Sequence, residues 1–127
     1  MGSSMERATR KSWKREPLPK ERVPLGYARA LTHIEASHMV DGFIPRAMED
    51  RWFILFDEDW LLFYRSWTGL CIYGLKFASF PEGMRVVDSW VNCDPSQYLP
   101  IDPSLEHALL DRLIDRMVMD ELRDIDA

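Results

Sequence analysis

Residues 27–39 carry hydrophobic positions at helical spacing. These positions lie four, three and four residues apart, which places them on one face of a helix: Tyr27, Leu31, Ile34 and His38. Gly42 and Pro45 follow the stretch, as is typical beyond the end of a helix. The pattern therefore predicts an N-terminal helix over residues 27–39.

From residue 51 onward, the helical spacing gives way to short aromatic and aliphatic runs separated by turn residues. These runs predict four strands: 51–56, 60–66, 70–77 and 84–91. The breaks between them contain acids, glycine or proline: Asp57-Glu58-Asp59, Thr68-Gly69 and Pro81-Glu82-Gly83. Connections this short join antiparallel neighbours, because parallel strands need a long crossover. The sequence therefore predicts a four-stranded antiparallel meander.

The dipeptide Asp-Pro occurs twice after the predicted sheet. Asp can cap a helix while Pro occupies its first turn without losing a needed hydrogen bond. The first, Asp94-Pro95, predicts a short turn through Tyr98. The second, Asp102-Pro103, predicts a long helix that reaches about Arg123. Its apolar stripe has the spacing of one helix face: Leu105, Leu109, Leu113, Ile114, Met117 and Val118. The expected fold is α+β, a four-stranded antiparallel meander with an N-terminal helix and a long C-terminal helix packed on the sheet.

Composition and charge divide the chain into an arm and a body. The chain has 127 residues, 46% hydrophobic and 29% charged, which is typical of a single globular domain. The formal net charge is −5, but residues 1–22 hold seven Lys or Arg against three Glu, a balance of +4. The rest of the chain therefore carries −9. We expect a basic N-terminal arm over residues 1–22 and a single α+β domain over residues 23–127.

The composition of the basic arm favours a flexible, solubilising tail. A second interpretation is contact with nucleic acid, in which Trp13 stacks on a base and the cations bind phosphates. The arm has one tryptophan and no repeat of basic and aromatic residues, which gives this interpretation little support. A third interpretation is docking of the arm on the acidic body.

Metal, redox and membrane signals are weak. The two cysteines, Cys71 and Cys93, form no disulfide framework, and no secretory signal is visible, so we expect a cytoplasmic protein. His33 and His38 lie five residues apart, on different sides of a helix, and cannot share a metal ion. The longest uncharged run, residues 66–75, is far shorter than the ~20 residues of a membrane-spanning helix. We expect no membrane contact, no cofactor, no metal and no catalytic residue.

The predicted hairpins place two arginines side by side. With a two-residue turn at Thr68-Gly69 and a three-residue loop at 57–59, Arg51 lies directly opposite Arg65, with Lys76 nearby. Like charges opposite each other destabilise a sheet, so an anion is expected between them.

The same register places Gly74 opposite Phe63, which leaves a shallow dent where a ligand or a backbone segment can approach. Two sources of the anion remain open. An acidic side chain of the protein, such as Asp50 or Glu35, would neutralise the arginines, with the N-terminal helix covering the apolar part of the face. A ligand or partner would instead supply carboxylate or phosphate, which guanidinium groups bind in pairs.

Further polar and aromatic residues complete the candidate site. Trp67 lies just before the turn, where it either folds over a helix end or anchors an interface. Asn92 and Asp94 lie at the end of the last strand, where capping is their ordinary role. The predicted binding residues are Arg51, Arg65, Trp67, Thr68, Lys76, Asn92 and Asp94.

Residues 48–98 contain a distinctive set of short motifs. They are Arg51-Trp52-Phe53, Arg65-Ser66-Trp67-Thr68-Gly69 and Ile72-Tyr73, followed by Val91-Asn92, Asp94-Pro95 and Tyr98. In these residues the chain resembles a small family of uncharacterised prokaryotic proteins. The resemblance implies no activity, but it draws attention to Arg65, Trp67 and Thr68.

The sequence favours a small soluble binding module that recognises an anionic group on the face bearing Arg51, Arg65 and Trp67. The expected partner is either a protein that presents a carboxylate or, alternatively, a small phosphorylated ligand. The apolar content of this face also allows a homodimer. The alternative is a small enzyme that acts on a nucleotide-like or phosphorylated substrate. The second alternative is contact with nucleic acid through the basic arm.

Overall fold

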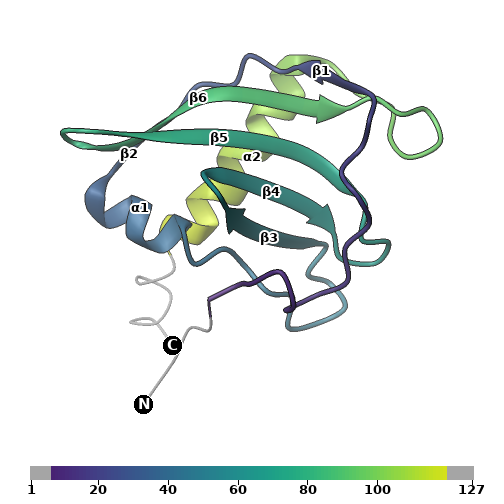
Figure 1. The fold of residues 1–127 in the computed structure, drawn as a ribbon, viewed down its shortest axis with the longest axis horizontal. Coiled ribbons are helices and arrows are strands. Elements are labelled where there is room, and N and C mark those ends of the chain that lie inside the picture. The colour runs from purple at the N-terminus through teal and green to yellow at the C-terminus, as the bar shows by residue number, and fades with distance from the viewer. Residues whose placement is uncertain (1–6, 120–127) are drawn as a thin grey trace.

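The structure, a computed structural model, describes residues 7–119, which form a six-stranded antiparallel sheet with two helices (Figure 1). The strands are β1 (Arg22–Pro24), β2 (Ala30–Thr32), β3 (Trp52–Asp57), β4 (Trp60–Arg65), β5 (Cys71–Phe80) and β6 (Gly83–Asn92). The helices are α1 (His33–Met39) and α2 (Pro103–Val118). The predicted α+β class with an antiparallel sheet is therefore confirmed.

Two short strands extend the sheet beyond the four that were predicted. The order across the sheet is β1-β6-β5-β4-β3, and both β1 and β2 pair with β6. Gly26 lies between them with a φ of 69°, a conformation that glycine adopts without a steric penalty. The count of four strands is wrong because β1 and β2 have three residues each, too few to show a period in the sequence.

The first helix is shorter than predicted. It begins after Thr32, whose side chain accepts a hydrogen bond from the Glu35 N–H, while the Glu35 side chain accepts one from the Thr32 N–H. Residues 30–32, which the helical spacing assigned to the helix, pair instead with β6. Ile34 was expected on the buried face and is 68% exposed, whereas Met39 is fully buried. The first part of the predicted helix is therefore wrong, because strand pairing and the capping box delay its start.

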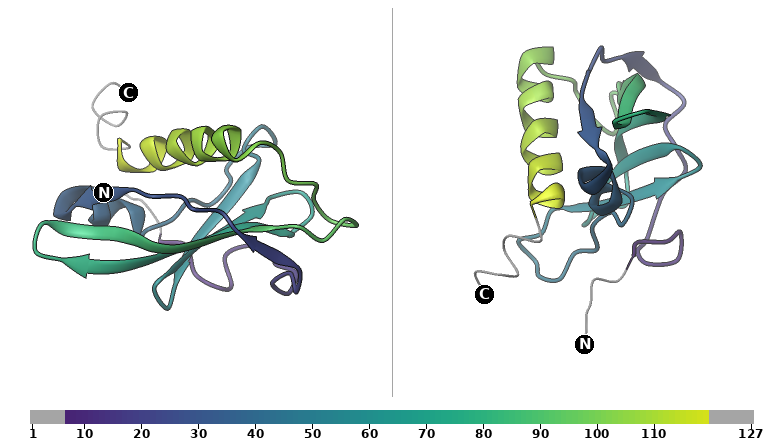
Figure 2. Two further views of the ribbon diagram at one scale, coloured as in Figure 1. Left: turned by 90° about the horizontal axis from the view of Figure 1, so that it is seen from above. Right: turned by 90° about the vertical axis from the view of Figure 1, so that its left-hand side faces the viewer.

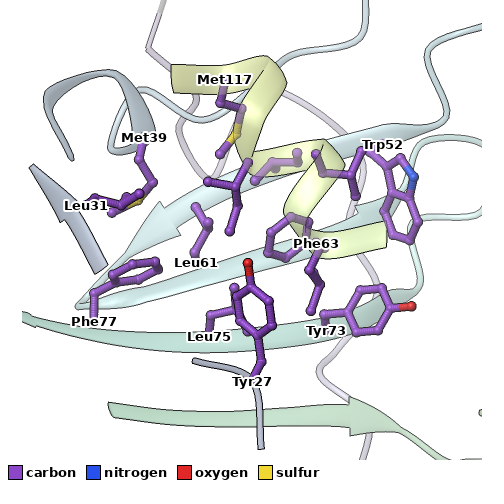
Figure 3. Packing of buried hydrophobic residues seen from close by; sticks show 14 of the residues in the cluster. Tyr27, Leu31, Met39, Trp52, Leu61, Phe63, Tyr73, Leu75, Phe77 and Met117 are labelled. Carbon is purple, nitrogen blue, oxygen red and sulfur yellow. The ribbon is translucent and has the colours of Figure 1, made fainter. Parts of the chain in front are cut away.

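The main core lies on the helix face, which we define as the face of the sheet covered by α1 and α2 (Figures 2 and 3). Strand and helix side chains meet there: Trp52, Ile54, Leu61, Phe63, Tyr73, Leu75, Phe77, Leu110, Ile114 and Met117. Leu105 was predicted in the apolar stripe of α2 but is 57% exposed, because Glu106 and Leu110 occupy the buried positions of its first turns. The predicted end near Arg123 lies outside the described residues. Within residues 7–119, no helix is long and apolar enough to cross a bilayer.

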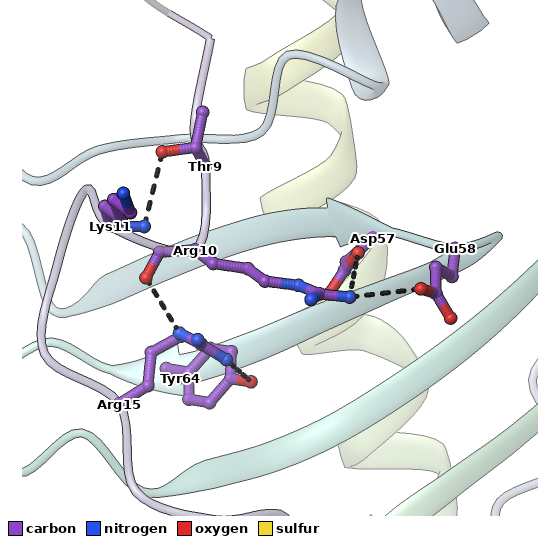
Figure 4. Close-up of polar contacts among 7 residues, drawn as sticks. All are labelled: Thr9, Arg10, Lys11, Arg15, Asp57, Glu58 and Tyr64. Carbon is purple, nitrogen blue, oxygen red and sulfur yellow. Dashed lines mark hydrogen bonds and ion pairs between the residues drawn. The ribbon is translucent and has the colours of Figure 1, made fainter.

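The N-terminal arm runs along the opposite face of the sheet, which we call the arm face (Figure 2). Trp13 donates a hydrogen bond from Nε1 to the Ser66 backbone oxygen at 2.7 Å and packs on the side chains of this face. Arg10 forms ion pairs with Asp57 and Glu58 at the β3–β4 turn (Figure 4). The described part of the arm is therefore docked on the body.

The β3–β4 connection is one residue shorter than predicted. It consists of Glu58 and Asp59, both with positive φ, instead of three residues. A shift of one residue moves the side chains of a strand to the other face of the sheet. Trp52 therefore lies opposite Arg65, and the prediction that Arg51 lies there is wrong.

The β4–β5 connection is longer than predicted. Residues 66–69 form a four-residue loop in place of a two-residue turn, and a bulge follows it. Gly74 pairs with Leu62, so its predicted pairing with Phe63 is wrong. The dent expected at Gly74 is filled by the Trp90 indole, since a Cβ added there would lie 2.4 Å from the ring.

Candidate functional site

A cavity of about 880 Å³ opens at the end of the sheet where β4 ends and β5 begins. The segment before β3, the β4–β5 loop and the turn after β6 line it. The lining residues are Met48, Glu49, Arg51, Arg65, Trp67, Thr68, Leu70, Gln97 and Tyr98. Ligand pockets commonly have volumes of about 300–1,000 Å³, so the cavity can hold a small ligand or a few residues of a peptide.

Arg51 and Arg65 both line this cavity, although they are not cross-strand neighbours. Arg65, the last residue of β4, places its guanidinium carbon 4.6 Å from the ring centroid of Trp52, a cation–π contact. Arg51 precedes β3, and its backbone oxygen accepts a hydrogen bond from the Ser66 N–H at 2.9 Å. Within residues 7–119, neither guanidinium group forms an ion pair. The structure therefore brings two guanidinium groups without an ion pair to one cavity, although the predicted cross-strand pairing is wrong.

The acidic residues proposed to neutralise the arginines have other partners. Oδ2 of Asp50 accepts hydrogen bonds from the backbone N–H groups of Arg46 and Ala47. Glu35 belongs to the capping box of α1. Within residues 7–119, neither carboxylate forms an ion pair with Arg51 or Arg65, so the expectation that these two side chains neutralise the arginines is wrong.

The charge of the cavity is positive overall. Its third charged residue is Glu49, which is exposed and forms no ion pair within the described part of the chain. Two arginines against one carboxylate leave an excess of one positive charge. An anion that enters the cavity meets this charge between partly apolar walls, where an electrostatic attraction is stronger than in bulk water.

Two large apolar side chains stand exposed at the cavity. Trp67 is 66% exposed and Met48 is 75% exposed. The Trp67 indole is nevertheless held in place, because its Nε1 donates a hydrogen bond to the Met48 backbone oxygen at 3.2 Å. An exposed tryptophan beside arginines matches the composition of binding hot spots.

Tyr98 lines the cavity on the α2 side, and a buried acid, Glu106, lies behind it. Glu106 is 1% exposed, and its Oε1 accepts hydrogen bonds from the hydroxyl groups of Tyr98, at 2.8 Å, and Tyr73. Its Oε2 accepts one from the Ile101 N–H. Burial, and then the bond to Glu106, raise the pKa of Tyr73. Burial also raises the pKa of Tyr98, an effect that the nearby positive charge of Arg65 reduces.

Sequence reasoning missed this buried acid. A signal for it exists in the sequence, because Glu106 lies four residues before Leu110 and therefore on the apolar face of α2. A carboxyl group in that position is costly to bury without hydrogen bonds. Glu106 accepts three hydrogen bonds, one of them from Tyr98, which holds the Tyr98 ring in place. This wall of the cavity is therefore preformed.

The other predicted site residues divide between the cavity and its surroundings. Thr68 lines the cavity, and its Oγ1 accepts a hydrogen bond from the Leu70 N–H. Lys76 is exposed, pairs with Trp60 and Asp88, and does not line the cavity. Its predicted place beside the arginines is wrong, because the bulge and the longer loop shift β5 relative to β4.

Asn92 and Asp94 hold the turn that follows β6. Asn92 is fully buried, and its Nδ2 donates hydrogen bonds to the Cys71 backbone oxygen and to Oε1 of Gln97, both at 2.9 Å. Oδ1 of Asp94 accepts hydrogen bonds from Ser96 and so shapes the turn. Asn92 therefore positions Gln97 at the cavity, whereas Asp94 lines a neighbouring hollow.

Neither Cys71 nor Cys93 lines the cavity. Cys71 is fully buried on the arm face, and burial raises the pKa of its thiol, so it is not poised as a nucleophile. Within residues 7–119, no three His, Cys, Asp or Glu side chains are grouped so that they can hold a metal ion. The polar groups of the cavity are thus two guanidinium groups, one carboxylate, hydroxyl groups and an amide.

Comparisons with known proteins add no relative to this picture. No family model, no curated protein and no solved structure matches the chain. The resemblance of residues 48–98 to uncharacterised prokaryotic proteins therefore stays a prediction.

Proposed function

We propose that the protein is a binding module that recognises an anionic group in the cavity lined by Arg51 and Arg65. The observation that carries the proposal is the presence of two guanidinium groups in one cavity without an ion pair within residues 7–119. A guanidinium group presents its N–H donors in a planar fork that matches carboxylate and phosphate. Glu49 offsets only one of the two positive charges of the cavity, and the ligand supplies further negative charge.

The rest of the cavity determines what accompanies the anion. Apolar surface is provided by Met48, Trp67, Leu70 and Tyr98. Trp67 stands at the rim, held by one hydrogen bond, and offers a flat apolar face. A ligand that joins a carboxylate or phosphate to an apolar body satisfies both parts of the site.

A thermal-shift experiment with three probes tests the proposal: phenyl phosphate, N-acetylphenylalanine and succinate. We expect at least one of them to raise the melting temperature of the wild-type protein, since a ligand at 100 times its dissociation constant stabilises the folded state by about 2.7 kcal/mol. The shift is expected to be lost in Arg65→Gln and reduced in Arg51→Gln. Lys76→Gln is the matched control, because this exposed cation lies outside the cavity.

Arg51→Gln is also the variant that is expected to fold normally if Arg65→Gln does not. Arg65 stacks on the buried Trp52 and contributes to packing, whereas Arg51 is exposed. The proposal is overturned if none of the three probes shifts the melting temperature. It is equally overturned if a shift persists unchanged when both arginines are replaced.

The contacts of Trp13 and Arg10 speak against nucleic-acid binding by the arm. Stacking on a base requires a free Trp13, but its Nε1 is bonded to the Ser66 backbone and its ring packs on the arm face. Arg10 is paired with Asp57 and Glu58. The observations therefore favour recognition at the cavity over recognition by the arm.

A further inference from the structure

A second hollow of about 690 Å³ adjoins the cavity. Three residues line both: Thr68, Leu70 and Gln97. The remaining wall of the second hollow comes from the arm and from the turn after β6: Glu16, Pro17, Leu18, Pro19, Lys20, Glu21 and Asp94. The two hollows lie on either side of these three shared residues, and we call the two together the groove.

The two ends of the groove carry opposite charge. The cavity end has two arginines and one glutamate, an excess of one positive charge. The arm end has three acids, Glu16, Glu21 and Asp94, against Lys20, an excess of two negative charges. Within residues 7–119, neither Glu16 nor Glu21 forms an ion pair.

Three hydrogen bonds hold the segments that lie between the two hollows. The Glu16 N–H donates to the Gly69 backbone oxygen at 2.8 Å, which ties the arm to the β4–β5 loop. Thr68 accepts from the Leu70 N–H within that loop. Oε1 of Gln97 accepts from the buried Asn92. The groove is therefore preformed, and a ligand that follows it does not have to order these segments.

We infer that the ligand is an extended peptide segment with an acidic residue in the cavity and a basic residue at the arm end. This inference rests on the proposed function, because the acidic residue is the anion bound by Arg51 and Arg65. A compact ligand fills one hollow, whereas an extended chain spans both and matches their opposite charges. The exposed Trp67 and Met48 receive an apolar side chain next to the acidic residue.

The opposite charges also impose a direction on the peptide. A basic residue on the correct side of the acidic one reaches Glu16 and Glu21, while a second acidic residue there is repelled. A basic residue on the other side of the acidic one lies away from these carboxylates. Binding is therefore expected to depend on the order of the two charges along the peptide.

Fluorescence anisotropy with a set of labelled peptides tests this inference. Each peptide has about ten residues, which span about 33 Å when extended, and contains one Asp followed by Leu in a Gly/Ser background. One Lys is placed at successive positions on either side of the Asp. We expect every Asp peptide to bind, and a Lys on one side only, at a narrow range of spacings, to increase affinity about three- to fivefold, the effect of one exposed ion pair.

Variants separate the two ends of the groove. Glu21→Gln is expected to reduce the gain from Lys while leaving the Asp-dependent binding unchanged, and Glu82→Gln, an exposed turn acid outside the groove, is the matched control. Arg51→Gln is expected to weaken all the Asp peptides. If Lys improves binding at no position, or if the gain survives in the Glu16→Gln, Glu21→Gln double variant, the peptide inference fails alone. If binding depends neither on Asp nor on the arginines, the proposed function fails as well.

The same assay distinguishes a nucleotide ligand. AMP is added as a competitor of the best peptide and, separately, as a ligand of the wild-type protein. We expect AMP to compete for the cavity alone and to bind more weakly than the peptide that carries both charges. Tighter binding of AMP, with unchanged affinity in Glu21→Gln, overturns the assignment of the groove to a peptide.

Discussion

Gly74→Ala tests the strand register that positions the cavity. In the structure, a Cβ added at Gly74 would lie 2.4–2.6 Å from three atoms of the Trp90 indole. Carbon atoms in contact are normally about 3.5–4.0 Å apart, so the ring has to retreat by about 1 Å. Trp90 is 8% exposed, and the Trp60 ring and the Arg22 guanidinium group also contact it. The indole therefore cannot move without disturbing its neighbours.

The magnitude follows from two opposing effects. Overpacking of this kind costs about 1–3 kcal/mol. Replacing glycine inside a strand returns about 0.5–1 kcal/mol, because the unfolded chain loses conformational freedom. The expected net destabilisation is about 1–2 kcal/mol, which lowers the melting temperature of a domain of this size by roughly 4–8 °C.

Urea denaturation of four proteins measures the effect: wild type, Gly74→Ala, Trp90→Leu and the double variant. In the Trp90→Leu background the space beside Gly74 is free, so we expect Gly74→Ala to be neutral or to stabilise by up to about 1 kcal/mol. A Gly74→Ala protein that equals or exceeds the wild type in stability, with Trp90 present, would refute the register. It would instead support the empty dent that a two-residue turn at Thr68-Gly69 creates.

Three further variants test the arm and two titrating groups. Trp13→Phe removes the indole N–H that donates a hydrogen bond to the β4–β5 loop, and it is expected to lower the free energy of unfolding in urea by about 1 kcal/mol. Trp67→Phe, at an exposed position, is expected to lower it less. Equal effects of the two variants would contradict docking of the arm. Burial, then the hydrogen bond that its hydroxyl donates to Asp111 of α2, raise the pKa of Tyr27 above its ordinary 10.0. Its contribution to the free energy of unfolding is therefore complete below pH 10 and is lost as the pH rises through the raised pKa. Tyr27→Phe is expected to flatten the alkaline fall in stability, and an unchanged slope would contradict this. Hydrogen bonds from Ser104 at the start of α2 lower the pKa of Asp102 below its ordinary 3.8. Its contribution to the free energy of unfolding is therefore present above pH 3.8 and is lost as the pH falls through the lowered pKa. Asp102→Asn is expected to remove this acid dependence from the unfolding curves, and its persistence would argue against the cap.

The sheet could be predicted from the sequence to a large extent, because its central strands are long and bounded by clear turn residues. β3 was expected at 51–56 and lies at Trp52–Asp57. The lengths of the turns could not be predicted from the sequence. The two-residue β3–β4 turn uses Glu58 and Asp59 at φ values of 49° and 73°, without the glycine that usually marks such a turn. The edge strands β1 and β2 escaped prediction because three residues show no period.

The candidate site was harder to predict than the fold, because a cavity depends on contacts between distant segments. Arg51 and Arg65 were grouped by a cross-strand argument that is wrong, and the structure brings them together at the edge of one cavity instead. Tyr98 was known only as the end of a turn, and its role in the wall depends on Glu106 from α2. Lys76 was included through the mistaken register and lies elsewhere.

The most direct test of an anion site at Arg51 and Arg65 is a side-chain NMR titration. Phenyl phosphate is added to protein labelled with ¹⁵N, and phenol, which has the same ring without the charge, serves as the matched control. We expect saturable shifts of the Nε–H signals of Arg51 and Arg65 and of the Trp67 indole N–H signal. We expect no change at Arg85, which stacks on Phe80 outside the cavity. Shifts that are equal for all arginines and do not saturate, or a response to phenol as strong as to phenyl phosphate, would contradict an anion site at Arg51 and Arg65.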